Sequence, residues 1–142
     1  MKKLKEIHTV GKRKEAVARV FVFPQGNGKI IINNKPLEFW GTEILRWRIR
    51  EPLILVRDAI DLSKYDIYVN VKGSGLVSQA EAIRLAIARA LAKIGKSKVE
   101  KIFENYDKFL LIADPRRCEP HHSSGKGASS RGSRRHKQRS KR

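Results

Sequence analysis

Positively charged side chains are concentrated at two places in the sequence, and both could bind the phosphates of a nucleic acid. The first place is Gly11-Lys12-Arg13-Lys14, where a glycine and three cations lie between two stretches with strand-like alternation. Adjacent cations in a turn concentrate positive potential where a nucleic-acid backbone can reach them. The same residues could also form an ordinary solvated loop, and this stretch alone does not decide between the two interpretations.

The second place is the C-terminal segment. From Pro120 to Arg142 the chain contains eight Lys and Arg, no Asp or Glu, and no Leu, Ile, Val, Phe, Trp or Tyr. Such a segment cannot bury itself, so we expect it to be disordered unless a partner orders it. Because all of its charged side chains are positive, it is more typical of a nucleic-acid-binding arm than of a plain linker. The candidate nucleic-acid-binding residues of this region are Arg116, Arg117, Lys126, Arg131, Arg134, Arg135, Lys137 and Arg139.

The overall composition also points to a polyanionic partner. The chain has 32 Lys and Arg against 14 Asp and Glu, a net charge of +18 and a pI near 10.5. That balance exceeds what solubility requires. The charge divides into +10 for residues 1–119 and +8 for residues 120–142. Its 142 residues suit one domain. We expect a folded nucleic-acid-binding domain over residues 1–114 and an extended basic tail over residues 115–142.

Cys118, His121 and His122 could in principle bind zinc, because thiolate and imidazole are good zinc ligands. The number of ligands is too small, since the chain has one Cys and the other histidines, His8 and His136, lie far away in sequence. We therefore expect no metal site. One cysteine also excludes an intramolecular disulfide and favours a reducing compartment. As a nucleophile it would lack a fixed base or oxyanion hole.

Lys72-Gly73-Ser74-Gly75 could form a phosphate-binding turn, because it lies between a predicted strand and a predicted helix. Its spacing fits neither of the glycine patterns of nucleotide-binding enzymes, and its lysine precedes the glycines. A structural turn is the better interpretation.

Catalysis and membrane insertion find no support elsewhere in the sequence. No paired carboxylates or Ser/His/Asp arrangement stand out, so we expect no enzyme, no cofactor and no small-molecule substrate. No apolar run approaches the roughly 18 residues of a membrane span, and the N-terminus lacks the apolar core of a signal peptide. We expect a soluble protein of the cytoplasm.

The elements that would carry these residues follow from periodicity. Alternation predicts strands at residues 6–10, 16–23, 29–32 and 65–71. Helical spacing predicts helices from Thr42 to Glu51 and from Pro52 onward. A central helix should begin at Ser78, whose spacing from Glu81 is that of a capping box, and end at Gly95; Ser97 should start another. The apolar run at residues 109–113 is too short to classify.

Apolar stripes on these elements predict the core. Tyr65, Ile67, Val69 and Val71 should form the inner face of their strand. The inner face of the central helix should be formed by Leu76, Ala80, Ile83, Ile87, Ala90 or Leu91, and Ile94. Trp40 and Trp47 could stack on bases, but large aromatic side chains beside a helix are more often core residues. The pattern predicts a single α+β domain, with a mostly antiparallel sheet and helices on one face.

Several of these motifs together resemble the S-nine family, the universal small-subunit ribosomal protein nine. In the central region the matching residues are Gly73, Gly75, Ser78-Gln79, Ala82, Ala86 and Ala88-Arg89-Ala90-Leu91. Upstream, the basic motif is followed by Val17-Ala18-Arg19-Val20, as in that family. Asp114-Pro115-Arg116 and Ser140-Lys141-Arg142 match the start and the end of its basic extension, in a form most like archaeal members. Ser74 replaces a usual glycine, and residues 121–124 and 128–130 depart from the pattern.

The resemblance implies a fold and a function. The fold would be that of the second domain of small-subunit protein five, with a left-handed crossover. The function would be that of a structural constituent of the small ribosomal subunit, which binds ribosomal RNA of the head beside neighbouring head proteins. Lys12, Arg13 and Lys14 would contact RNA, and Ser140, Lys141 and Arg142 would approach the peptidyl-site tRNA. A free-standing regulator that binds DNA or RNA is the alternative that composition alone leaves open.

Overall fold

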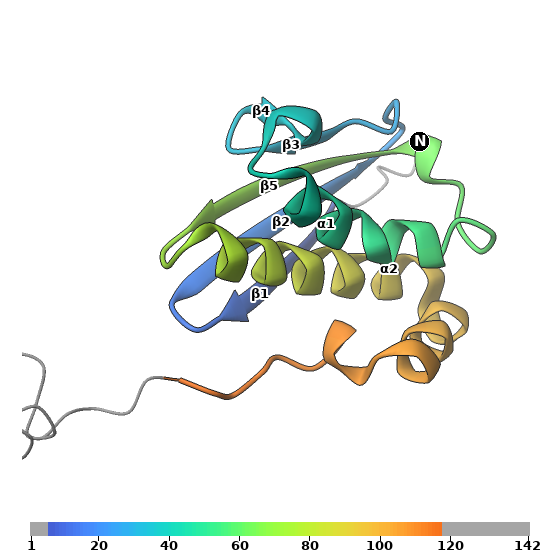
Figure 1. Ribbon diagram of the computed structural model, residues 1–142. Helices are drawn as coiled ribbons and strands as arrows, with labels where there is room; N and C mark the ends of the chain where they lie inside the picture. Colours follow the sequence, from blue (N-terminus) through green and yellow to red (C-terminus); the bar gives the residue numbers. More distant parts are fainter. Residues whose placement is uncertain (1–5, 118–142) are drawn as a thin grey trace, which may run out of the picture.

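The chain forms a five-stranded sheet with two helices on one of its faces (Figure 1). The structure is a computed structural model that describes residues 6–117. The strands are β1 (Ile7–Arg13), β2 (Ala16–Pro24), β3 (Ile30–Ile32), β4 (Lys35–Pro36) and β5 (Tyr65–Lys72). Their order is β1-β2-β5-β3-β4, and β3–β5 is the parallel pair among antiparallel ones. The prediction of one α+β domain with a mostly antiparallel sheet is confirmed.

The helices are α1 (Glu43–Leu55) and α2 (Leu76–Tyr106), accompanied by short 3-10 turns at Leu37–Phe39, Leu62–Lys64 and Lys108–Leu110. Helix α2 packs against β1 and β2 on one side and against α1 on the other. It is therefore buried well beyond one stripe, since Ala82, Leu85 and Ala88 are buried together with the predicted Ile83, Ile87 and Leu91. Small side chains suit a helix that is packed on both sides.

Close contact between β1 and α2 depends on two small residues of the strand. A Cβ atom on Gly11 would lie 2.1 Å from the carbonyl oxygen of Ala82 and 2.8 Å from the nitrogen of Ala86, so only glycine fits here. Two residues earlier, Thr9 is buried and its Oγ1 donates a hydrogen bond of 2.8 Å to the carbonyl oxygen of Ala86. The glycine of the basic motif thus sets the distance between helix and sheet.

The predicted start of the central helix at Ser78 is wrong. Helix α2 begins at Leu76 with Gly75 as its N-cap, without a side-chain capping bond. The turn before it takes positive φ at Gly73 (+87°) and Ser74 (+54°), so the chain is already directed into the helix two residues early. Leu76 is 51% exposed and does not belong to the core stripe.

Helix α2 changes direction where two helices were predicted. Lys96 has non-helical angles, with φ of 50° and ψ of −143°. The sequence predicted that the helix would break at Gly95, but the non-helical residue is Lys96, and Gly95 is needed for close packing instead. Its Cβ would lie 2.1 Å from Cγ2 of Val99, so glycine is required there by close packing, and the left-handed conformation falls on the following residue.

The prediction of a helix boundary at Pro52 is wrong. Helix α1 continues through Pro52 to Leu55, and the residues after it form turns. A proline inside a helix removes one backbone hydrogen bond. Here Pro52 and Leu53 are both buried, and their burial offsets that loss. Val56 and Ile60 enter the core as predicted, although they do so from a turn.

The two tryptophans have different environments. Trp40 is 7% exposed and belongs to the core, as predicted, whereas Trp47 is 54% exposed on the outer side of α1. In residues 6–117, no helix combines the length and the apolar character needed to cross a bilayer.

Candidate nucleic-acid interface

The basic motif forms the tip of the β1–β2 hairpin, and its three cations do not point the same way. Side chains alternate along β1, so Thr9, Gly11 and Arg13 face the helices while Lys12 faces the opposite side. Lys14 follows in the turn with φ of 53°. Lys12 and Lys14 are exposed to solvent, whereas the Arg13 side chain is only 19% exposed.

Arg13 is held by two carboxylates from distant parts of the chain. Its Nε donates a hydrogen bond of 2.5 Å to Oε2 of Glu81 on α2. Its Nη1 lies 2.5 Å from Oδ2 of Asp114, an ion pair that lacks hydrogen-bond geometry. Glu81 also accepts a bond of 2.9 Å from Arg48 of α1. Arg13 therefore connects the hairpin to α2 and to the segment that follows the last 3-10 turn.

Lys12 and Lys14 line a cavity of about 440 Å³ at the same end of the sheet. Its other lining residues are Glu15, Val17, Ser74 and Arg117. Three cations against one carboxylate give this cavity a positive balance. A phosphate group suits such a place, because Arg offers a planar fork of donors and Lys a compact charge.

The turn before α2 adds to the positive character of this end. Ser74 lines the cavity, and the helix that begins two residues later has no side-chain cap on its first backbone N–H groups. Those groups carry the positive end of the helix dipole. The Gln79 side chain donates a hydrogen bond of 3.1 Å to the carbonyl oxygen of Gly73 and helps to fix the turn.

Asp114 controls the direction of the chain as it leaves the domain. It accepts hydrogen bonds from the Arg116 side chain, with Nη2 at 2.7 Å, and from the Arg116 backbone nitrogen at 2.9 Å. These bonds, the side-chain ones first, lower the pKa of Asp114 from 3.8 to about 2. Because Arg116 is engaged with this carboxylate, Arg117 is the cation of the pair that lines the cavity.

A second ion-pair cluster joins the two helices away from this end. Arg84 donates to Glu51 through Nε at 2.6 Å and Nη2 at 3.0 Å, and to Asp107 at 3.1 Å. The Tyr106 hydroxyl donates a bond of 2.9 Å to Glu51. Since its one cation, Arg84, is paired with two carboxylates, we assign this cluster a structural role.

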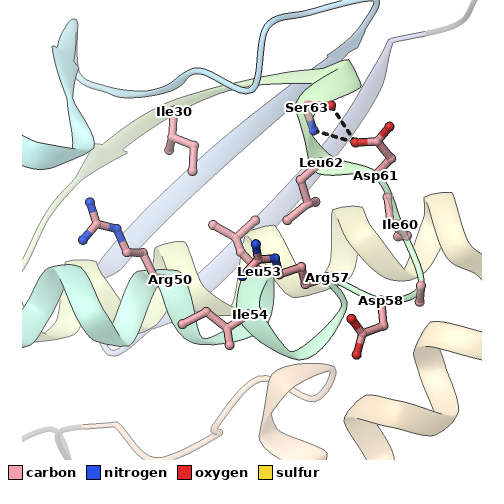
Figure 2. A pocket seen from close by; sticks show the side chains of 11 residues that line it. Ile30, Arg50, Leu53, Ile54, Arg57, Asp58, Ile60, Asp61, Leu62 and Ser63 are labelled. Atoms are coloured by element: carbon pink, nitrogen blue, oxygen red, sulfur yellow. Dashed lines mark hydrogen bonds between the residues drawn. The ribbon is translucent and has the colours of Figure 1, made fainter.

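A larger hollow of about 740 Å³ lies between β3, the C-terminal half of α1 and the turns at residues 56–63 (Figure 2). Its walls are mostly apolar, and its charged members are Arg50, Arg57, Asp58 and Asp61. Asp61 accepts bonds from the nitrogen and the Oγ of Ser63, as Figure 2 shows, and thereby caps a 3-10 turn. The bond from the Ser63 side chain, with that from Lys64, lowers the pKa of Asp61. No histidine or lysine is among its lining residues, and the Ser63–Asp61 bond is the local cap of the 3-10 turn, so we assign the hollow no catalytic role.

The remaining predicted tail residues lie outside the described residues: Lys126, Arg131, Arg134, Arg135, Lys137, Arg139, Ser140, Lys141 and Arg142, together with Cys118, His121 and His122. Over residues 6–117, no group of three or more His, Cys, Asp or Glu side chains is placed to hold a metal ion. The sequence analysis considered Lys72 only as part of a glycine turn and Arg19 only as part of a family motif; both are exposed on the side of the sheet away from the helices. Strand alternation was the signal that could have identified them.

Comparison with known proteins decides the family. The model of the ribosomal protein S9/S16 family matches residues 11–142. The chain belongs to that family. It is therefore a ribosomal protein, a structural constituent of the small subunit in the cytoplasm, and not an enzyme.

Curated relatives agree with this assignment over most of the chain. A small ribosomal subunit protein uS9 of Methanococcus maripaludis is 43% identical over 138 residues, which cover 96% of this chain and 98% of the relative. The protein of the same name from Methanococcus vannielii is 42% identical over the same coverage. That of Desulfurococcus amylolyticus is 46% identical over 120 residues, 83% of each chain. All three organisms are archaea, as the resemblance of the tail predicts.

Proposed function

We propose that this protein binds ribosomal RNA in the head of the small subunit through the end of the sheet that carries Lys12, Lys14 and Arg117. The observation that carries the proposal is the cavity that these three cations line. Phosphate contacts of this kind position a protein on a folded RNA without reading its sequence. The fold of the second domain of small-subunit protein five, with its left-handed crossover, and contacts with neighbouring head proteins belong to the same proposal.

Arg13 has a different role within this proposal. Its ion pairs with Glu81 and Asp114 leave it little capacity to bind a phosphate. It instead holds the hairpin and the start of the tail together, so that Lys12, Lys14 and Arg117 face one ligand. We therefore assign phosphate contacts to Lys12 and Lys14 and a positioning role to Arg13, in place of the three phosphate contacts expected from the sequence.

The basic tail, residues 115–142, extends this interface beyond the folded domain of residues 1–114. At about 3.3 Å per extended residue, the segment from Pro120 to Arg142 could reach on the order of 70 Å. Its Lys and Arg residues bind ribosomal RNA along the way. Ser140, Lys141 and Arg142 reach the backbone of the peptidyl-site tRNA, which two cations can contact without regard to sequence.

A binding experiment separates this function from that of a free-standing regulator. The full chain is titrated against transcribed small-subunit ribosomal RNA and against short RNA and DNA duplexes of unrelated sequence at several salt concentrations. A ribosomal protein should prefer the folded ribosomal RNA at every salt concentration. A large preference for one short duplex would favour the regulator.

The tRNA contact has its own test. Small subunits are purified with the full-length chain or with a chain that lacks Ser140 to Arg142. We expect nearly normal subunit assembly but tRNA binding at the peptidyl site weaker by about 1 to 3 kcal/mol, because charge-assisted contacts to phosphate are lost. Equal affinities at matched salt would mean that the tip ends in ribosomal RNA.

A further inference from the structure

The face of the sheet away from the helices carries a row of ring-bearing side chains across three adjacent strands. Strand register places His8 of β1 opposite Phe21 of β2, and Phe21 opposite Tyr68 of β5. Ile31 of β3 continues the row beside Tyr68. These residues alternate with the buried ones of each strand, so their side chains leave the sheet on its uncovered side.

The rings of this face are in contact with one another and accessible to solvent. The ring centroids of His8 and Phe21 are 4.7 Å apart, and those of Phe23 and Tyr68 are 5.5 Å apart in an edge-to-face arrangement. Phe23 is 38% exposed and Tyr68 40% exposed. Aromatic side chains of this size are normally buried, so a cluster of them on an open face marks a binding surface.

A hollow of about 290 Å³ lies beside the same row. Phe21, Ile31 and Tyr68 form its apolar wall, and Asn34 and Asn70 supply exposed amide groups. Asn33 also lines it, but its amide is bonded to the backbone of Val71 at 2.9 Å in both directions. A flat ring could contact the aromatic wall while its polar edge meets the exposed amides of Asn34 and Asn70.

The charges around this row select a polyanion as its partner. The five strands contain one acidic residue, Asp66, whose Oδ1 accepts hydrogen bonds from the backbone nitrogens of Asn27 and Lys29, against the cations Lys12, Arg19 and Lys72. On the same face, Arg19 lies opposite Asn70, and Lys72 lies opposite Val17, whose other neighbour is Lys12. The face therefore runs from aromatic rings through Arg19 to the cationic end that lines the phosphate cavity. An apolar protein surface would not complement the cationic part of this face, whereas the phosphates of an RNA strand would.

We propose that the uncovered face of the sheet is a stacking platform for unpaired RNA bases, with Phe21, Phe23 and Tyr68 as its rings. It rests on the proposed binding of RNA and adds a second kind of contact, to bases as well as to phosphates. Stacking on aromatic rings is the way in which an open sheet binds single-stranded RNA, because every base has a flat face. Lys12, Arg19 and Lys72 hold the backbone of the same strand.

The test compares two probes that have the same phosphates. Octauridylate carries bases, and an abasic ribose-phosphate octamer does not. Affinities of the full chain are measured at about 0.3 M salt, where non-specific attraction to the basic tail is weakened. We expect the wild-type chain to bind octauridylate about fivefold or more tightly than the abasic octamer.

Matched variants assign that difference to the sheet face. The Phe23→Leu/Tyr68→Leu variant keeps apolar bulk at exposed positions and should bind the two probes equally. The Phe39→Leu/Phe109→Leu variant removes two exposed rings from the 3-10 turns and should keep the wild-type difference. Lys12→Ala/Lys14→Ala should weaken binding of both probes alike. Circular dichroism of each variant confirms that it is folded, and the single variant Tyr68→Leu replaces the double one if that fails to fold.

Several outcomes would overturn the platform. The proposal would be wrong if the wild-type chain bound the two probes equally. It would also be wrong if the Tyr68→Leu variants kept the full wild-type preference for octauridylate over the abasic octamer. If those variants bind both probes normally but fail to enter small subunits, the face is a protein interface. In each of these cases, retained binding of the abasic octamer leaves the proposed phosphate contacts standing. Binding of neither probe would remove the platform, and the titration with folded ribosomal RNA would then decide on the phosphate contacts.

Discussion

Nη1 of Arg13 lies 2.5 Å from Oδ2 of Asp114, so the cationic hairpin is connected to the residue at which the chain leaves the domain. The two residues are 101 positions apart, and Glu81 of α2 completes the cluster through Nε of Arg13. The ion pair brings Lys12, Lys14 and Arg117 around one cavity. The architecture of the candidate interface follows from this relationship.

Replacing Arg13 should therefore affect stability more than RNA binding. We expect Arg13→Ala to lower the free energy of unfolding by about 1 to 3 kcal/mol, because Glu81 and Asp114 lose a partly buried partner. Urea unfolding measures the change. Arg57→Ala, which removes an exposed arginine, should change stability by less than about 0.5 kcal/mol. An Arg13→Ala protein as stable as wild type would contradict the anchoring role.

Lys12 and Lys14 should provide the salt-dependent part of binding by the folded domain. For Lys12→Ala/Lys14→Ala, the slope of log affinity for small-subunit RNA against log salt should become shallower by roughly 1.5 to 2, because two phosphate contacts release fewer counterions. Lys98→Ala/Lys101→Ala removes the same charge from exposed positions of α2 and is the control. A slope that changes equally in both variants would mean that only net charge matters.

Gly11 should not tolerate any side chain. A Cβ there meets the backbone of Ala82 and Ala86, so Gly11→Ala should cost about 2 to 3 kcal/mol of stability through overpacking. Gly75→Ala is the matched control. A Cβ at Gly75 has no neighbour within 4 Å, and its φ is −90°, so the cost should stay below about 1 kcal/mol. Thermal unfolding of both variants compares them, and equal losses would show that β1 and α2 are not in close contact.

The carboxyl group of Asp114 should titrate near pH 2. Hydrogen bonds from Arg116 lower its pKa in the folded state from 3.8 to about 2. The stabilisation from this group is therefore complete above pH 3.8 and is lost as the pH falls through about 2. Carbon-detected NMR of the carboxyl group measures this pKa. Arg116→Gln should raise it toward 3.8, whereas Arg117→Gln should leave it low; a wild-type value near 3.8 would contradict the described contacts.

Periodicity predicted the elements of the fold well where one pattern acted alone. The inner residues of β5 and the buried positions Ile83, Ile87 and Leu91 of α2 are where alternation and helical spacing place them. Predictions failed where tertiary packing overrode a local signal. Helix α1 did not end at Pro52, because the burial of this residue offsets the lost hydrogen bond. Helix α2 began before Ser78, because the turn at Gly73 and Ser74 directs the chain into the helix at Leu76.

The cations of the candidate interface could be named from the sequence, but their partners within the fold could not. Charge counting placed Lys12, Arg13 and Lys14 together as equivalent cations. Strand alternation separates them, because it turns Arg13 toward Glu81 and Lys12 toward solvent. The pairing of Arg13 with Asp114 joins residues far apart in sequence, and no local pattern encodes such a contact.

Sedimentation of the chain in cells tests the central claim, that this protein works while bound to ribosomal RNA in the small subunit. An N-terminally tagged full-length chain is expressed, and extracts are separated on a sucrose gradient at moderate salt. We expect the tagged chain to sediment with free small subunits and with whole ribosomes, and Lys12→Ala/Lys14→Ala to shift part of it to the top of the gradient. A wild-type chain found only at the top, as free protein, would rule out this function.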